Sequence, residues 1–279
     1  MPQKGTTQFM PAVSLSDVID YVRRSIRNPW ETGIVPGLVA AGFLLGLSIA
    51  GYKIYEHRVT GGVGFVEATE LAGLDDVQVE EKKRQFFDAL RPIIEAENGR
   101  IAELRKRLIA ARDSGQDPSW VFGVAEDYDV TWTGHEWRVL LRRVDTIPMT
   151  LAMAQAANES SWGQSRFAQE GNNLFGQWCF TEGCGIVPED RPAGDNHEVR
   201  AFGSINESVR SYLHNINTHR AYRELRQARA RARAEGRAAS GLELAGYLDS
   251  YSERGAKYIE EIRATVRVNR DLMLDAANQ

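Results

Sequence analysis

The chain has 279 residues, a formal net charge of −4 at pH 7, and 43% hydrophobic and 26% charged residues. This composition is typical of a globular protein, and the lack of a basic excess argues against nucleic-acid binding. The two cysteines, Cys179 and Cys184, are too few for a disulfide scaffold and lack the companions that a structural zinc site needs. We therefore expect no metal, no other cofactor and no nucleic-acid partner.

The first distinctive segment is an uncharged apolar run. Thr32 to Tyr52 contains no charged residue, and ~20 such residues can span a bilayer as a helix. A buried core helix is the alternative, but five glycines in the run are poor choices for a water-soluble helix and are tolerated in membranes. We predict a transmembrane helix over residues 33–52, which would contact the bilayer, after a cytoplasmic tail over residues 1–32.

The orientation of this helix follows from its flanking charges. Arg23, Arg24 and Arg27 precede the run, whereas the basic residues that follow it are accompanied by Glu56. The positive-inside rule therefore predicts a cytoplasmic N-terminus and a large C-terminal part on the far side of the membrane. The segment before Ser48-Ile49-Ala50 is long for a cleaved signal peptide, so we expect an uncleaved anchor.

Residues 53–80 contain glycines and acidic residues and are interpreted as a linker. Residues 81–118 are predicted to be a helical extension, because Phe86, Leu90, Ile93 and similar residues recur at spacings of three and four. Pro92 is expected to kink or restart this helix. Residues 119–275 are predicted to form the main domain.

Within that domain, a helix that begins near Pro148 carries a carboxylate at its end. Apolar residues from Met149 to Ala156 share one face, and Glu159 extends that face. Desolvation and the helix dipole both disfavour the ionised form of a carboxylate placed there. The alternative, on position alone, is an ordinary solvated glutamate.

Two short segments carry a family resemblance. Ala156 to Ser165 reads A-A-N-E-S-S-W-G-Q-S, and Gly171 to Gly176 reads G-N-N-L-F-G. They resemble the A-x-x-E-S-x-W-G-x-S and N-N-L-F-G motifs of the glucosaminidase domains of glycoside hydrolase family 73. A wider stretch, from Phe86 to Tyr258, is similar to the Bax-type branch of that family. The members of this branch are bacterial proteins and are not the apoptotic factor of the same name. The resemblance covers about two thirds of the chain.

The resemblance implies an α+β, mostly α, lysozyme-like domain with a small β-lobe over a sugar-binding cleft. It also implies an endo-β-N-acetylglucosaminidase that cuts the glycan strands of peptidoglycan in the periplasm, with Glu159 as general acid. Glycoside hydrolysis needs such a protonated carboxyl at the leaving oxygen. N-acetylmuramidase or lytic transglycosylase specificity is a close alternative, and a non-catalytic wall-binding module is a second class of function.

The second acidic group is left open. Residues 179–202 alternate turn formers with apolar residues and are predicted to form the β-lobe, where Glu189 and Glu198 both qualify by position. Hydrolysis assisted by the substrate's own N-acetyl group would need neither. Tyr251 matches a tyrosine that lines the cleft in the family and would position the acetamido group or water.

The remaining expectations concern contacts. A disulfide between Cys179 and Cys184 is reasonable in an oxidising periplasm, and two unpaired thiols are the alternative. The arginine run from Tyr222 to Gly236 is predicted to be a solvated helical face that could be attracted to an anionic surface. Trp162 is either a sugar platform or core support behind the acid. The full set of expected substrate contacts is Gln155, Ser160, Trp162, Asn173, Phe175, Gly176 and Trp178.

Overall fold

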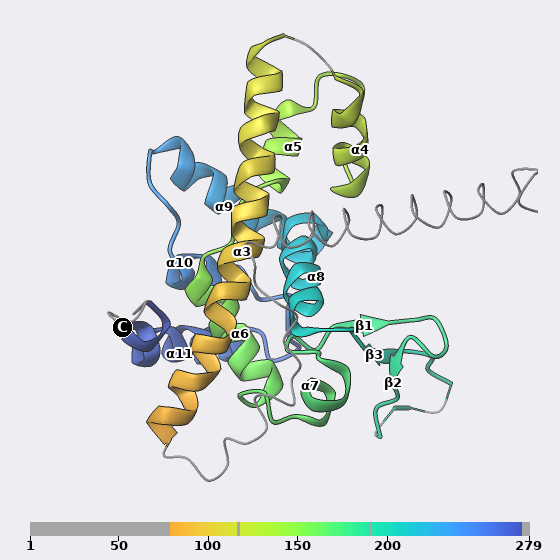
Figure 1. The fold of residues 1–279 in the computed structure, drawn as a ribbon, viewed down its shortest axis with the longest axis vertical. Coiled ribbons are helices and arrows are strands. Elements are labelled where there is room, and N and C mark those ends of the chain that lie inside the picture. Colours follow the sequence, from red (N-terminus) through yellow and green to blue (C-terminus); the bar gives the residue numbers. More distant parts are fainter. Residues whose placement is uncertain (1–78, 116–117, 190, 193, 275–279) are drawn as a thin grey trace, which may run out of the picture. The chain divides into compact units, whose positions relative to one another are not determined.

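A computed structural model describes residues 79–115, 118–189, 191–192 and 194–274. This part of the chain is mostly helical with one small sheet, so the α+β class is confirmed for it (Figure 1). Its elements are α3 (Val79–Asp113), α4 (Ser119–Asp127), α5 (Trp137–Arg143), α6 (Met149–Ser160), α7 (Arg166–Gly171), β1 (Trp178–Cys179), β2 (Gly185–Ile186), β3 (Glu198–Arg200), α8 (Ile205–Thr218), η2 (Arg220–Tyr222), α9 (Arg223–Ala234), α10 (Gly241–Ala245) and α11 (Ala256–Leu274).

The predicted transmembrane helix, residues 33–52, and the tail before it lie outside the described residues. Among the helices that the structure does describe, none is both long enough and apolar enough to cross a bilayer.

The segment predicted as a helical extension forms α3, a single helix of 35 residues. Pro92 lies inside it, so the helix does not restart there. Phe86 and Phe87 are fully buried and belong to the same hydrophobic core as the residues of α6 and α11. The extension is therefore part of the main fold.

Helix α6 lies at the centre of this core and packs against α3, α10 and α11. Every side chain from Leu151 to Ala157 is buried, and four of these seven are alanines, which let neighbouring helices approach closely. Pro148 precedes the first turn, which suits its fixed backbone angle. The helix ends at Ser160, and the residue that follows, Ser161, has a left-handed φ of 52°.

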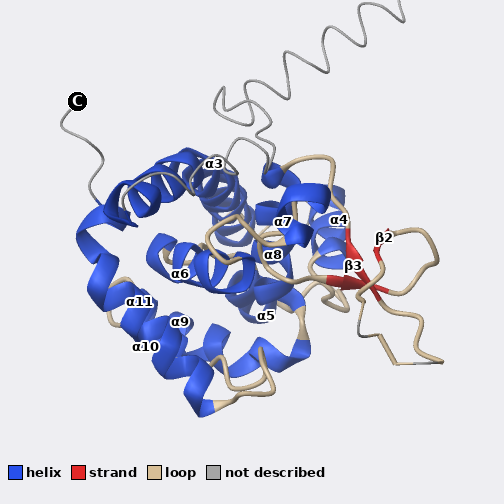
Figure 2. Cartoon of the chain, turned by 90° about the horizontal axis from the view of Figure 1, so that it is seen from below, coloured by secondary structure: helices blue, strands red, loops and turns tan. Residues whose placement is uncertain are grey.

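The predicted β-lobe is a three-stranded antiparallel sheet in the order β1-β3-β2, which lies to one side of the helices (Figure 2). Strand β3 pairs Val199 with Trp178 of β1 and with Ile186 of β2. Gly185 has no room for a side chain, because a Cβ there would lie 2.0 Å from the Val199 carbonyl oxygen. The close pairing of β2 with β3 thus depends on this glycine.

The arginine run differs from its prediction in part. It forms η2 and α9, as expected of a helix, but Arg226 and Arg229 are each only 3% exposed. Arg226 donates hydrogen bonds to the main-chain carbonyls of Ile216 and His219. Arg229 does the same for carbonyls near the end of α5, at Arg142 and Asp145. These two guanidinium groups therefore satisfy helix-end carbonyls and are not part of a solvated face.

Candidate active site

Glu159 lies in the last turn of α6 and is partly buried. The loop after α7 lies beside the Glu159 carboxylate. A Cβ atom placed on Gly176 of that loop would lie 3.6 Å from Glu159 Oε2. Gly176 has a φ of 63°, which favours glycine, and it leaves the space beside the carboxylate open. The two motifs of the sequence therefore meet in space at Glu159.

The charge of Glu159 acts on four tyrosine hydroxyls: Tyr212 on α8, Tyr222 at the end of η2, Tyr251 before α11 and Tyr258 within it. Burial raises the pKa of each hydroxyl, that of Tyr222 to about 12, and the negative charge of Glu159 adds to each rise. These hydroxyls therefore keep their protons at neutral pH.

Tyr251 connects the turn before α11 to the second motif. Its hydroxyl donates to the main-chain carbonyl of Phe175 at 2.9 Å, and its ring stacks on Tyr258. The ring of Phe175 in turn stacks on Tyr212 with 4.0 Å between centroids. The predicted cleft tyrosine therefore holds in place the backbone that leads into Gly176.

The first motif folds into a tight turn behind the acid. Ser160 Oγ donates to the Ala156 carbonyl and accepts a hydrogen bond from the Gly163 amide at 2.8 Å. Ser161, Trp162 and Gly163 all have positive φ, so the chain reverses within three residues. The indole of Trp162 packs edge-on against Phe86 and Phe87 of α3, at 5.6 and 5.4 Å between centroids. Trp162 thus supports the turn from the core side.

The second motif is organised by Asn173, which is 1% exposed. Its Nδ2 donates to the carbonyls of Gln177 and Arg200, at 2.9 and 2.8 Å. Its Oδ1 accepts from the amides of Phe175 and Gln177. One side chain therefore uses its amide oxygen and nitrogen to fasten the loop beside Glu159 to strand β3.

Several of the expected substrate contacts are buried side chains in this structure. Gln155 and Ser160 are completely buried, and Asn173 and Phe175 are at most 2% exposed, so a sugar cannot reach them in this structure. Their hydrogen bonds and stacking instead build the walls of the site. Gln155 accepts a hydrogen bond from Tyr212 at 2.7 Å and donates one to Tyr258 at 3.1 Å.

Trp178, in contrast, is available to a ligand. It lies on β1 with 58% of its surface exposed, and one face of its ring stacks on His197 at 4.3 Å with 18° between the planes. Because one face is covered by the imidazole, the other face and the edges account for the exposure. Such a flat exposed indole suits the apolar face of a pyranose ring.

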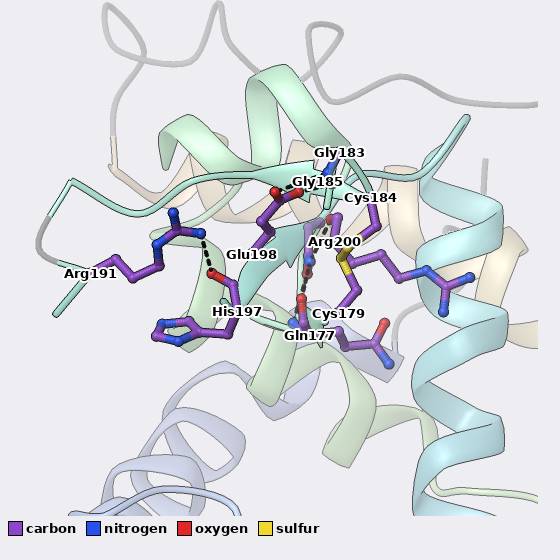
Figure 3. The surroundings of a disulfide bond; sticks show 10 residues. Gln177, Cys179, Gly183, Cys184, Gly185, Arg191, His197, Glu198 and Arg200 are labelled. Atoms are coloured by element: carbon purple, nitrogen blue, oxygen red, sulfur yellow. Dashed lines mark hydrogen bonds between the residues drawn. A yellow bond between two sulfur atoms is a disulfide. The ribbon is translucent and has the colours of Figure 1, made fainter. Parts of the chain in front are cut away.

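The two carboxylates predicted as candidates for the second acidic group have other partners in this structure. Glu189 is highly exposed, with Arg166 3.7 Å away. Glu198 is 4% exposed and accepts hydrogen bonds from the amides of Gly183 and Gly185, at 3.0 and 2.8 Å (Figure 3). These hydrogen bonds, that of Gly183 first, lower the pKa of Glu198. Glu198 thus holds together the turn between β1 and β2.

Cys179 and Cys184 form a disulfide that closes the same turn (Figure 3). Together with Glu198 they are the one cluster of possible metal ligands in the described part of the chain. Because the two sulfurs are bonded to each other, they do not offer the thiolates that a metal would require. The cluster is a covalent and hydrogen-bonded staple of the β-lobe.

A cavity of about 380 Å³ opens at the other end of α6, beside Pro148. Its basic lining residues are already paired, since Arg233 contacts Asp145 at 2.5 Å and Arg237 contacts Glu243 at 2.7 Å. Glu159 does not line this cavity. The candidate site at Glu159 is therefore separate from this cavity.

Sequence reasoning missed three of the four tyrosines, namely Tyr212, Tyr222 and Tyr258. Tyr258 was the easiest to find, because it follows Tyr251 in a segment that resembles the family. Tyr212 lies outside the motifs, and only the packing of α8 against the loop at Phe175 shows its place.

Comparisons with known proteins identify the family of this chain. The family described as mannosyl-glycoprotein endo-beta-N-acetylglucosaminidase matches residues 135–270, which include both motifs and all four tyrosines. Protein bax of Escherichia coli (strain K12) is 32% identical over 200 residues, which span 69% of this chain and 71% of that protein. No solved structure shows a significant match.

Proposed function

Because this chain belongs to the Bax-type proteins with a glucosaminidase domain, we propose that it hydrolyses the glycan strands of peptidoglycan with Glu159 as general acid. The observation that carries this proposal is the position of Glu159 in the last turn of α6, where Gly176 of the second motif lies directly beside its carboxylate. A glycosidic oxygen that enters over Gly176 would meet the carboxyl directly.

In this mechanism the Glu159 carboxyl transfers its proton to the leaving oxygen as the glycosidic bond breaks. Positive charge develops on the sugar ring, and the ionised Glu159 left behind helps to stabilise it.

The second step requires water or a nucleophile, and the proposed source of assistance is the substrate. Glu198 is engaged by two main-chain amides, and Glu189 is exposed beside Arg166. These positions favour participation of the N-acetyl group of the substrate over a protein carboxylate. They are also consistent with endo-β-N-acetylglucosaminidase activity, which is the specificity we propose.

The bond specificity is tested by digesting purified peptidoglycan with the full chain and identifying the new ends by mass spectrometry. We expect reducing N-acetylglucosamine ends. Reducing N-acetylmuramic acid ends would instead indicate a muramidase, and 1,6-anhydro ends a lytic transglycosylase. Binding of the wall without any new end would show a non-catalytic binding module and overturn the proposal.

We further propose that residues 33–52 anchor the chain in the inner membrane and that the C-terminal domain lies in the periplasm. The uncharged run and its arginine-rich flank support this topology. A reporter that is active only in the periplasm, fused after Gln279, should be active. An inactive reporter on a stable fusion would contradict the orientation.

A further inference from the structure

The cavity at the start of α6 is lined by three segments and has a volume of about 380 Å³. One segment is the part of α3 around Gly99, and a second is residues 146–148, which lead into α6. The third is α9 with the loop that follows it, which contributes three arginines, Arg229, Arg233 and Arg237. The volume lies within the range of small-molecule sites in proteins.

The arginine side of this cavity carries an excess of positive charge. Asp145 is buried, and its carboxylate lies within 3.8 Å of the guanidinium groups of Arg105, Arg229 and Arg233. Burial lowers the pKa of Arg229 to about 10, and the charge of Asp145 opposes that fall, so Arg229 stays protonated at neutral pH. One carboxylate therefore faces three cations, which favours a further anion in the cavity.

Two of the lining arginines keep N–H groups that no described residue accepts. Arg229 donates to main-chain carbonyls through Nη1 and Nη2, whereas its buried Nε has no hydrogen-bond partner. The carboxylate of Asp145 is 3.7 Å from this Nε, too far for a hydrogen bond. Arg233 donates to Asp145 through Nε and Nη2, and its Nη1 has no acceptor among the described residues. An oxyanion in the cavity would supply such an acceptor.

The remaining walls suit a small apolar group. They consist largely of Ala102, Ile147, Pro148, Ala238 and Ala239. Gly99 lies inside α3, where glycine is unfavourable, and a Cβ atom there would meet nothing within 4 Å. The bare backbone of α3 at Gly99 therefore leaves this side of the cavity open.

We propose that this cavity binds a small monocarboxylate, with its carboxylate toward Arg229 and Arg233 and its short apolar chain toward α3 and residues 146–148. The planar fork of arginine matches a carboxylate group. The third arginine, Arg237, is already paired with Glu235 and Glu243, whose charges oppose a dianion such as phosphate. Because Glu159 does not line the cavity, this site is independent of the proposed hydrolysis.

The binding test titrates the full chain with butyrate, with butyramide as its neutral analogue, and with inorganic phosphate, all at constant ionic strength. Nitrogen NMR follows the Nε–H group of Arg229 and the amide of Ile147. We expect saturable shifts with butyrate and an affinity for butyramide that is at least about tenfold weaker, because hydrogen bonds to a charged group are lost. Failure of butyrate to bind, or tighter binding of butyramide or phosphate, would overturn the proposal.

The location of the site is tested by Gly99→Leu, which places a side chain in the cavity. Leucine favours a helix more than glycine does, so the fold should be kept, and butyrate should no longer shift the Arg229 resonance. Gly123→Leu is the matched control, because a Cβ atom at Gly123 also meets nothing within 4 Å but this residue lies on α4, away from the cavity. Wild-type affinity in a folded Gly99→Leu protein would overturn the proposal.

The charge of the ligand is tested by a second pair of variants at Ala102, which is exposed on α3 and lines the cavity. Ala102→Glu places a negative charge beside the site, and Ala102→Gln adds a neutral side chain of similar size. We expect Ala102→Glu to bind butyrate several-fold more weakly than Ala102→Gln, and added salt should reduce the difference. Equal affinities at low salt would contradict a site for an anion, even if Gly99→Leu does not fold.

Discussion

The rings of Tyr251 and Tyr258 lie parallel, with 6° between their planes and 5.4 Å between their centroids, but their hydroxyls bind different partners. Tyr251 donates to the carbonyl of Phe175, and Tyr258 accepts a hydrogen bond from the side chain of Gln155 on α6. One stack thus joins the loop beside the acid to the helix that carries it. Replacing either tyrosine by phenylalanine would keep the stack and remove one connection.

The Tyr251→Phe substitution should lower stability, because it leaves the buried Phe175 carbonyl without its donor. The expected loss is about 1–3 kcal/mol in the free energy of unfolding, which thermal or denaturant unfolding would measure. Activity should also fall, since Phe175 leads directly into Gly176 beside Glu159. An unchanged unfolding free energy would show that the hydrogen bond does not fix the loop.

Asn173→Ala should be more damaging, because it removes two donated and two accepted hydrogen bonds. We expect a loss of about 2–4 kcal/mol from the buried groups left unpaired. Asn173→Asp is the matched variant. It keeps an acceptor for the Phe175 and Gln177 amides but places a second oxygen against two carbonyls, so it should also be destabilised. Wild-type stability of both variants would contradict the structural role of Asn173.

The sequence predicts the secondary structure around the site better than it predicts which side chains are buried there. The helix over Pro148 to Glu159 and the small sheet were predictable, because apolar spacing and turn residues are local properties. The burial of Asn173 and Phe175 was not predictable, since an N-N-L-F-G segment reads equally well as a surface loop that contacts sugar. Only the approach of β3 and α8 shows that these side chains face inward.

Glu198 should make the β-lobe sensitive to acid. Its pKa is lowered in the folded state, chiefly by the hydrogen bond from the Gly183 amide, so its contribution is present above the unfolded pKa of about 4.3. The contribution is lost as the pH falls through the lower folded value. Glu198→Gln should remove this part of the acid dependence, as measured by unfolding from pH 7 to pH 2. An identical pH dependence in wild type and variant would contradict it.

Trp178→Ala should weaken binding to purified peptidoglycan if the indole is a platform for a sugar ring. Because the indole would stack on a sugar with only one face, we expect its loss to lower the affinity for peptidoglycan several-fold. Sedimentation of the protein with the wall would measure this decrease. Phe122→Ala is the control, because Phe122 has the same 58% exposure but lies on α4. Equal binding by both variants and the wild type would exclude the platform.

The arginines of α9 and the residues of α3 show a second limit of sequence reasoning. The sequence predicts a solvated Arg226, because arginine side chains are mostly exposed in proteins. In the structure Arg226 donates hydrogen bonds to two main-chain carbonyls near the end of α8. The sequence predicts that Phe86 and Phe87 belong to a separate helical extension. In the structure both rings pack against Trp162, in the turn that follows Glu159. The spacing of apolar residues along the chain predicts the helices. Contacts between elements that are distant in the sequence decide which of their side chains are buried.

The most direct test of the account compares Glu159→Gln with the wild-type chain at equal concentration in the release of soluble muropeptides. Glu103→Gln is the matched control, because Glu103 is exposed on α3 with Lys106 3.9 Å away, an ion pair worth little. Gln keeps the volume of Glu159 but cannot deliver a proton, so we predict at least a ~100-fold loss of hydrolysis with an unchanged unfolding temperature. Normal digestion by a folded Glu159→Gln protein would contradict the central claim that Glu159 is the catalytic acid.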